Sequence, residues 1–430
     1  MRFAVKFLGC KVSQADVMLA RRALLAAGHE EVSQEEAELH VVNTCCITRE
    51  AEAKSRQAVR RSLQSARRVF VGGCAVNRDA RQFAEIDPAI APFVGTAEEV
   101  AQAMAGTLGG CADLEHDVLG RELARAAEEP AGLWAGGRTR GFVKVQDGCD
   151  CHCAYCIIPT VRGGARSRPA EAVLQEVRRR VENGQPEIVL TGISVGDYRD
   201  GESGLDLGEL LMAAARVAGV ERVRLSSVEV IHVKDSLVRA LREEEKVCPH
   251  LHVPMQSGDD EVLAAMGRHY SAAEYLQAIE ELRAGVPEVN LTTDVIVGFP
   301  NEDEAAFERT VELVERCQIS KVHTFPYSAR PGTVAAALGE GVTAQEKKRR
   351  SRALRGFSEL CSRRHRTTKL ASSERVLVDK VADTQCSGYT ADYTRCYLPA
   401  DAARAGELIE VEVRELYADG LRVSPVAGSR

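Results

Sequence analysis

The chain has 430 residues, a formal net charge of −7, 45% hydrophobic residues and 14 cysteines. Its length indicates several domains with large cores, and no apolar run is long enough to span a bilayer. No secretory signal is evident at residues 1–7, so we expect a cytoplasmic protein whose cysteines are metal ligands and buried thiols, not a disulfide framework.

The first hundred residues alternate strand-like and helix-like patterns, which predicts an open parallel α/β sheet. Strands are expected at 3–8, 39–42 and 69–72, with helices at 13–27 and 48–66. Cys10, Cys45 and Cys74 each follow one of these strands. Because the carboxyl ends of parallel strands meet at one edge, these thiols could hold an iron–sulfur cluster with one open iron. Cys46 is a neighbour of Cys45 and is expected to point elsewhere.

A second group of cysteines lies at residues 149–156, in the run CDCHCAYC. Cys149, Cys153 and Cys156 have the spacing C-x3-C-x2-C. Three thiolates leave one iron of a cubic cluster open, and a second molecule can bind there. In radical S-adenosylmethionine (SAM) enzymes that molecule is SAM. A zinc site usually uses paired C-x2-C hooks and a fourth ligand, and four cysteines in eight residues argue against simple buried thiols.

Residues 141–327 alternate strand and helix about six times, which predicts a partial or complete β/α barrel. Strands are expected at 142–146, 187–191, 222–225, 250–253, 291–297 and 321–325. Polar residues at the carboxyl ends of these strands are candidate SAM contacts. They are Thr191, Gly192, Ser226, Glu229, Gln256 and Asp294.

The end of the chain combines a basic segment with short strands. Residues 343–380 contain 12 Lys and Arg against 4 Asp and Glu, a net of +8, so the remainder carries −15. Within this segment Lys347, Lys348, Arg349 and Arg350 form a candidate phosphate-binding run, although a solvated helix is the simpler interpretation of the segment alone. Five short strand-like runs after residue 371 predict a small β-barrel of an RNA-binding type.

These features together resemble the methylthiotransferase family of radical SAM enzymes, over essentially the whole chain. The matching motifs are 8–12 (LGCKV), 42–45 (VNTC), 146–149 (QDGC), 252–258 (HVPMQSG) and 294–300 (DVIVGFP). The resemblance implies an N-terminal methylthiotransferase domain at 1–112, a connector at 113–137, a radical SAM barrel with the basic helical segment at 138–370, and a TRAM domain at 371–430.

The resemblance also implies two [4Fe–4S] clusters, one at Cys149, Cys153 and Cys156 for SAM and an auxiliary one at Cys10, Cys45 and Cys74. SAM would serve as the radical source, because the C–H bond at carbon 2 of adenine has no acidic proton. A second SAM would serve as the methyl donor. Expected partners are a tRNA anticodon stem-loop, a sulfur donor and an electron donor such as a flavodoxin or ferredoxin, with the enzyme itself a monomer. Further RNA contacts are expected at Arg162, Arg166 and Arg168.

Within the family, the motifs 225–229 (LSSVE) and 325–333 (FPYSARPGT) are similar to the branch that acts on N6-threonylcarbamoyladenosine beside the anticodon. Sister branches, which modify isopentenyladenosine in tRNA or an aspartate of a ribosomal protein, remain alternatives. Two other classes are a cobalamin-dependent radical SAM enzyme and a non-enzymatic RNA-binding iron–sulfur protein. The strand-end cysteines argue against the first and the C-x3-C-x2-C run against the second.

Overall fold

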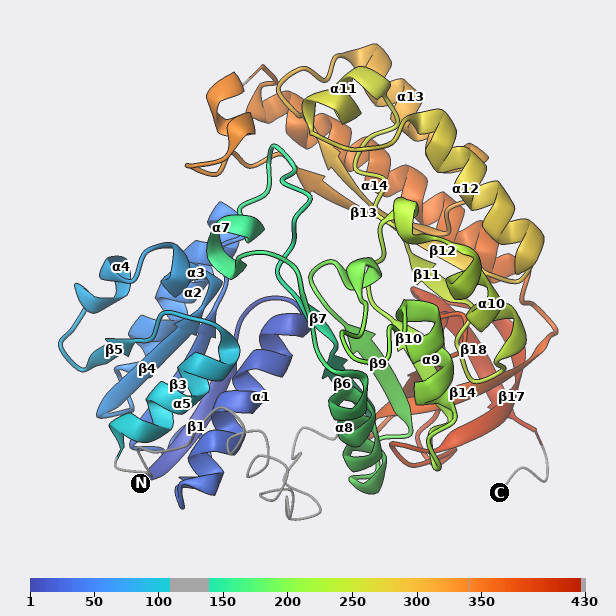
Figure 1. Cartoon of the computed structure of the whole chain (residues 1–430). Helices are drawn as coiled ribbons and strands as arrows, with labels where there is room; N and C mark the ends of the chain where they lie inside the picture. Colours follow the sequence, from blue (N-terminus) through green and yellow to red (C-terminus); the bar gives the residue numbers. More distant parts are fainter. Residues whose placement is uncertain (109–138, 340, 427–430) are drawn as a thin grey trace. The chain divides into compact units, whose positions relative to one another are not determined.

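A computed structural model describes residues 1–108, 139–339 and 341–426, so the expected connector at 113–137 lies outside the described residues. The chain divides into two compact units (Figure 1). Unit 1 comprises Met1–Ala131, Asp147–Arg166 and Arg330–Thr333, and unit 2 comprises Gly132–Gln146, Ser167–Ala329 and Val334–Arg430. The C-x3-C-x2-C loop therefore packs as part of the same unit as the N-terminal sheet. Among the described residues, no helix has the length and apolar character needed to cross a membrane.

Unit 1 is built on a five-stranded parallel sheet of order β2-β1-β3-β4-β5. Its strands are β1 (Arg2–Phe7), β2 (Glu30–Glu31), β3 (Leu39–Thr44), β4 (Arg68–Gly73) and β5 (Ile90–Pro92). The three strands expected from the sequence are confirmed. The two edge strands are only two and three residues long, too short to show a period in the sequence.

Helices cover both faces of this sheet. They are α1 (Lys11–Ala26), α2 (Arg49–Ser62), α3 (Cys74–Arg78), α4 (Arg81–Ala84), α5 (Ala97–Thr107) and α7 (Ile158–Arg162). Successive strand residues point to opposite faces, so Val41 belongs to the core under α1 and α5, whereas Val42 belongs to the core under α2. Thr48 is the N-cap of α2, because its side chain accepts a hydrogen bond from the Ala51 N–H at 3.1 Å.

Unit 2 contains the six parallel strands expected for the barrel. They are β6 (Arg140–Lys144), β9 (Glu187–Thr191), β10 (Arg222–Leu225), β11 (His250–His252), β12 (Asn290–Val297) and β13 (Lys321–Pro326). They pair as two sheets of order β10-β9-β6 and β11-β12-β13, and bridges such as Ser227–His252 join β10 to β11. The result is an open barrel rather than a closed one, with its functional edge at the carboxyl ends of the strands.

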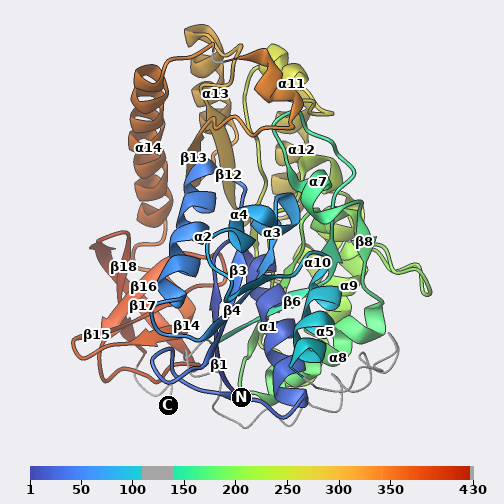
Figure 2. The same ribbon diagram turned by 90° about the vertical axis from the view of Figure 1, so that its left-hand side faces the viewer.

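Helices alternate with these strands and bury one large apolar core. They are α8 (Ala170–Glu182), α9 (Leu207–Ala215), α10 (Asp235–Glu243), α11 (Asp260–Ala265), α12 (Ala272–Gly285), α13 (Glu304–Arg316) and α14 (Ala344–Thr367). The basic segment forms α14, a helix of 24 residues that stands out at the left of Figure 2.

The last part of unit 2 is a closed barrel of order β14-β15-β16-β18-β17, which confirms the predicted small all-β domain. Its strands are β14 (Ser373–Val381), β15 (Gln385–Tyr389), β16 (Arg395–Pro399), β17 (Leu408–Tyr417) and β18 (Gly420–Pro425).

This small barrel closes the amino-terminal end of the large one. Buried Arg224 binds Glu187 at 2.8 Å and donates to the carbonyl oxygens of Thr390 and Ala391, both at 2.6 Å. Removing residues 371–430 would leave this buried charge pair open to water. Surface substitutions, and not truncation, are therefore the appropriate test of an RNA-binding role for this end of the chain.

Candidate metal centres and their surroundings

The three strand-end cysteines lie at the carboxyl edge of the unit 1 sheet. Cys10 precedes α1, Cys45 follows β3 directly, and Cys74 is the first residue of α3. Burial raises the pKa of Cys45, and it raises the pKa of Cys74 to about 11. A charge on Cys10 would raise both pKa values further, so the three thiols are close enough to act on one another electrostatically.

Two glycines allow the loops that carry these cysteines to approach one another. Gly9 has φ +129° and Gly73 has φ +94°, values that residues with a Cβ rarely adopt. A Cβ on Gly9 would lie 3.4 Å from Cys45 Cβ and 2.5 Å from Ser13 Oγ, and one on Gly73 would lie 1.8 Å from Asn43 Oδ1. The glycines before Cys10 and Cys74 therefore bring the three strand-end loops together.

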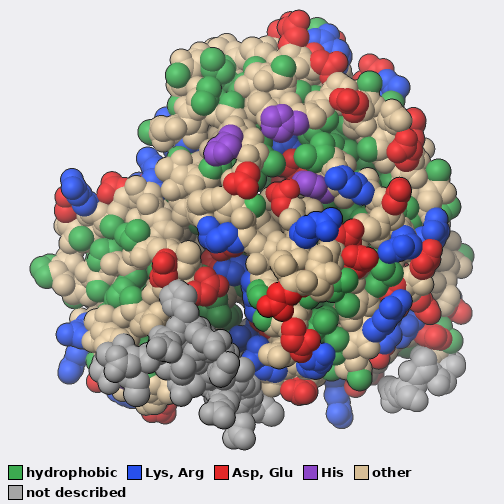
Figure 3. All heavy atoms as spheres, viewed as in Figure 1, with side chains coloured by type: hydrophobic (Ala, Val, Ile, Leu, Met, Phe, Trp, Pro, Cys, Tyr) green, Lys and Arg blue, Asp and Glu red, His purple; other side chains and the backbone are tan. Residues whose placement is uncertain are grey.

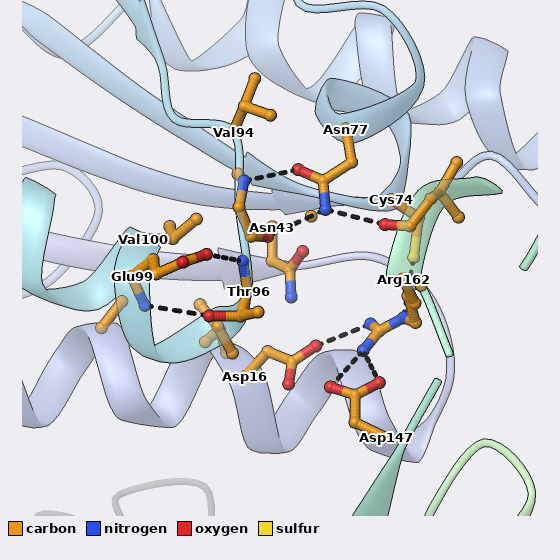
Figure 4. Close-up of a pocket in the computed structure, with 18 of the residues that line it drawn as sticks. Asp16, Asn43, Cys74, Asn77, Val94, Thr96, Glu99, Val100, Asp147 and Arg162 are labelled. Atoms are coloured by element: carbon orange, nitrogen blue, oxygen red, sulfur yellow. Dashed lines mark hydrogen bonds and ion pairs between the residues drawn. The ribbon is translucent and has the colours of Figure 1, made fainter. Parts of the chain in front are cut away.

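Arg162 joins this edge to the C-x3-C-x2-C loop (Figure 4). Its Nε–H donates to Cys74 Sγ at 3.1 Å, and its two terminal nitrogens bind Asp147 at 2.9 Å and Asp16 at 2.7 Å. These side chains line one wall of a cavity of about 300 Å³. The Arg162 side chain is only 7% exposed. The structure thus corrects the expectation that Arg162 contacts RNA, because its guanidinium is enclosed and bound by two carboxylates.

The second group of cysteines forms a loop between β7 (Gln146–Asp147) and β8 (Arg166–Ser167), which pair as a two-stranded sheet. Cys149, Cys153 and Cys156 are all partly exposed. Gly148 has φ +72°, and a Cβ there would lie 1.9 Å from Gly164 O. The loop is thus closed at its base by a backbone contact that only glycine permits.

Both groups of thiols suit an iron–sulfur cluster in their chemistry. Within residues 1–108, 139–339 and 341–426, no three His, Cys, Asp or Glu side chains form a set that could hold a metal ion. A cubic cluster binds each thiolate through a different iron, so its ligands stand further apart than those around one ion. Thiolates are also the ligands that such clusters take.

Two of the predicted SAM contacts are carboxylates with side-chain partners: Asp294 inside β12 and Glu229 after β10. Asp294 Oδ1 lies 3.0 Å from His252 Nε2, and Thr292 Oγ1 lies 2.8 Å from the other ring nitrogen. Glu229 accepts a hydrogen bond from Arg268 Nη1 at 3.0 Å. Nothing in the sequence around Arg268 distinguishes it from the many surface arginines, so its contact with Glu229 is visible only in the structure.

The remaining predicted SAM contacts differ in what surrounds them. Thr191 and Ser226 are buried at the ends of β9 and β10, and Ser226 Oγ has no hydrogen-bond partner among the described residues. Gln256 has φ +64°, a strained conformation that is common near functional sites. A Cβ on Gly192 would lie 3.0 Å from Gln146 O. Gly192 therefore has a packing role within the barrel that the sequence did not reveal.

The basic run on α14 is largely bound within the protein. Lys347 is 8% exposed, with Nζ 5.2 Å from the centre of the Tyr327 ring, and Arg350 is 5% exposed and binds Glu302 at 2.6 Å. Arg349 is exposed but pairs with Glu346 at 2.6 Å. The structure corrects the expectation for Lys347 and Arg350, which present no charge to solvent. Lys348 is exposed and remains a candidate.

The two other arginines expected at RNA also make contacts inside the chain. Arg166 is exposed and donates to the carbonyl oxygens of Gly164 and Arg162 at 3.2 and 3.1 Å. The Arg168 side chain is 29% exposed and binds Glu176 at 2.8 Å. Across the face seen in Figure 3, basic and acidic side chains are intermixed.

Two family models match the chain. The Radical SAM superfamily matches residues 143–314, and a family described as Uncharacterized protein family UPF0004 matches residues 2–95. The second match spans the strands that precede Cys10, Cys45 and Cys74.

Curated relatives match over nearly the whole chain. Threonylcarbamoyladenosine tRNA methylthiotransferase MtaB of Thermotoga maritima is 33% identical over 97% of this chain and 95% of its own length. The protein of the same name from Bacillus subtilis is 31% identical over 94% and 92%. A tRNA-2-methylthio-N(6)-dimethylallyladenosine synthase of Natranaerobius thermophilus is 30% identical over 96% and 94%.

Solved structures share the fold at low sequence identity. The radical SAM methyltransferase TsrM of Kitasatospora setae, with cobalamin and a [4Fe–4S] cluster bound, superposes with a TM-score of 0.57 at 12% identity, covering 78% of this chain and 77% of that one. The fold of the two α/β regions is therefore that of multidomain radical SAM enzymes.

Proposed function

We propose that this chain, which belongs to the radical SAM methylthiotransferase family, converts N6-threonylcarbamoyladenosine in tRNA to its 2-methylthio derivative. Family membership establishes a radical SAM tRNA methylthiotransferase that uses SAM and a [4Fe–4S] cluster. The choice of modified adenosine, the second cluster and the ligand residues are the proposed part. The alternative of a non-enzymatic iron–sulfur protein falls with the family assignment.

One observation supports the second cluster above others. Cys10, Cys45 and Cys74 follow three neighbouring strands in the same compact unit as the loop that carries Cys149, Cys153 and Cys156. Arg162, six residues after Cys156, reaches Cys74 Sγ at 3.1 Å. A methylthiotransferase must bring a sulfur source to a carbon radical, so two cluster sites in one folded unit suit this reaction.

The two groups of cysteines and the polar residues at the barrel edge would then have different roles. Cys149, Cys153 and Cys156 would hold the cluster that, when bound, supplies the electron for reductive cleavage of SAM. Cys10, Cys45 and Cys74 would hold the auxiliary cluster. At the barrel edge, buried Ser226 Oγ has no hydrogen-bond partner within residues 1–108, 139–339 and 341–426, and Arg268 binds Oε1 of Glu229. The Ser226 hydroxyl could donate or accept a hydrogen bond with SAM, and the Glu229 carboxylate could accept one.

The relatives of this chain are named for two different modified adenosines. Three of them are named for threonylcarbamoyladenosine and others for dimethylallyladenosine, so identity alone does not choose. Mass spectrometry of tRNA nucleosides from a strain lacking this protein makes the choice. We expect the 2-methylthio form of threonylcarbamoyladenosine to vanish and its precursor to accumulate. Loss of the methylthio form of isopentenyladenosine would instead identify isopentenyladenosine as the substrate. Unchanged tRNA nucleosides would indicate that the substrate is the aspartate of a ribosomal protein.

The tRNA surface proposed for α14 is its exposed basic face. Lys348, Arg352, Arg355 and Arg363 are exposed and lie along one side of the helix. Within the described part of the chain none of their four side chains makes a hydrogen bond or ion pair. They are therefore available to phosphates in a way that Lys347 and Arg350 are not.

Replacing Lys348, Arg352, Arg355 and Arg363 together by Gln should weaken tRNA binding and reduce the slope of log affinity against log salt by about 3. The measurement is tRNA affinity across a salt series. A matched control changes the exposed residues Lys54, Arg178, Arg216 and Arg242 to Gln, which alters net charge equally. An equal loss of tRNA affinity in both variants would mean that the exposed face of α14 is not a specific tRNA-binding surface.

A further inference from the structure

We propose that Arg162 is a positioning residue for the auxiliary site, and that its N–H···S hydrogen bond to Cys74 sets the reduction potential of the cluster held there. This inference rests on the proposed function, because it requires a cluster at Cys10, Cys45 and Cys74. It replaces the role in RNA contact that the sequence suggested for this residue.

The geometry holds the guanidinium from three sides. Arg162 is the last residue of α7, and its Nε–H donates to Cys74 Sγ at 3.1 Å. Nη1 donates to both oxygens of Asp147, at 2.9 and 3.1 Å, and Nη2 donates to Asp16 Oδ2 at 2.7 Å. In Figure 4 the guanidinium lies between the two carboxylates and Cys74.

The two carboxylates determine where the Nε–H points. A guanidinium is planar and has its donors in a fixed fork, so binding at both terminal nitrogens fixes the direction of the third donor. An arginine guanidinium is not deprotonated in proteins. The side chain therefore acts as a charged donor to Cys74 Sγ.

A charged donor on a ligand sulfur affects the electronic properties of the cluster. Reduction adds negative charge to the cluster, and hydrogen bonds to its sulfurs stabilise that charge. Cys10 has a weaker contact, with its Sγ 3.7 Å from the neutral Ser13 hydroxyl. Arg162 would thus raise the potential of the cluster and make the iron bound to Cys74 different from the iron bound to Cys10.

A purely structural role is the competing explanation. Arg162 ties α7 to α1 and to the start of α3, and its loss would destabilise unit 1 whatever its effect on a cluster. Arg21 provides a matched control in the same unit. Its side chain is 2% exposed and its Nε binds Glu31 at 2.7 Å, on α1 and away from the three cysteines.

The experiment uses full-length protein in which Cys149, Cys153 and Cys156 are Ala, so that only the auxiliary cluster remains. Into this background we introduce Arg162→Lys, Arg162→Met or Arg21→Met. Iron content, thermal midpoint, the EPR spectrum of the reduced cluster and its midpoint potential are measured for each. Lys keeps the charge but cannot reproduce the planar fork.

We expect Arg162→Met to have a lower reduction potential and a changed EPR spectrum, Arg162→Lys to fall between it and the parent, and Arg21→Met to change only the thermal midpoint. If Arg162→Met loses its iron, the inference is tested by the midpoint potential and EPR spectrum of Arg162→Lys. An unchanged potential and spectrum in an Arg162 variant that keeps its iron would overturn the inference and leave the proposed function intact. If the variant that lacks only Cys149, Cys153 and Cys156 holds no iron, both the inference about Arg162 and the proposed auxiliary cluster would be wrong.

Discussion

Replacing Cys149, Cys153 and Cys156 together by Ala should abolish SAM cleavage and leave about four of about eight irons per chain after anaerobic reconstitution. The loss of cleavage should be complete, because electron transfer to SAM requires the cluster that these thiolates would hold. The remaining irons should belong to the site at Cys10, Cys45 and Cys74. Iron analysis and a deoxyadenosine assay make both measurements on the same preparation.

Cys151→Ala is the control within the same loop. Residue 151 supports Cys149 through its backbone, since its N–H donates to Cys149 Sγ at 3.4 Å. Alanine keeps that N–H, so this variant should retain both clusters and most of its activity. A triple variant without any iron, or with all of it, would contradict two independent sites. Loss of cleavage in Cys151→Ala would show that the spacing misidentified the ligands.

The positions of the strand-end cysteines could be inferred from the sequence because they follow from topology alone. Parallel strands end at a common edge, so a cysteine after each of three strands is brought to one place whatever the side-chain packing. The same argument placed Thr191 and Ser226 at the carboxyl ends of β9 and β10, whereas Asp294 lies inside β12. A partial barrel was among the expectations from the six strands, but the short edge strands β2 and β5 could not be seen in this way.

Burial of charged residues is what the sequence could not reveal. The run at 347–350 has the composition of a phosphate-binding surface, yet a helix turns each side chain by about 100° from the last. Lys347 and Arg350 consequently face Tyr327 and Glu302, while Lys348 and Arg349 face solvent. Arg162 illustrates the same difficulty, because its partner Asp16 is 146 residues away in the chain.

Cys45→Ala should lose the auxiliary cluster and all methylthiolation while it keeps SAM cleavage, whereas Cys46→Ala should keep both clusters. The structure supports this choice between neighbours. Cys46 is fully buried in the core with Val42 and Val59, its Sγ–H donates to Cys74 O at 3.3 Å, and burial raises its pKa to about 12. The Cys46 thiol is thus directed at a backbone carbonyl oxygen, whereas the Cys74 thiol, in the same core, lies at Arg162 Nε.

Cys45 is also buried, at 6% exposure, but its side chain faces the loop of Cys10, because a Cβ on Gly9 would lie 3.4 Å from Cys45 Cβ. Its backbone is fixed by Ser55, which accepts from the Cys45 N–H at 3.0 Å and donates to its carbonyl oxygen at 3.1 Å. Burial raises the pKa of its thiol, although the backbone hydrogen bond at Ile47 and the charges of Arg162 and Arg330 lower it. Removing the Cys46 thiol should cost only about 1 kcal/mol of stability. Iron content, deoxyadenosine formation and the methylthiolated nucleoside are measured for both variants, and the reverse pattern would make Cys46 the ligand.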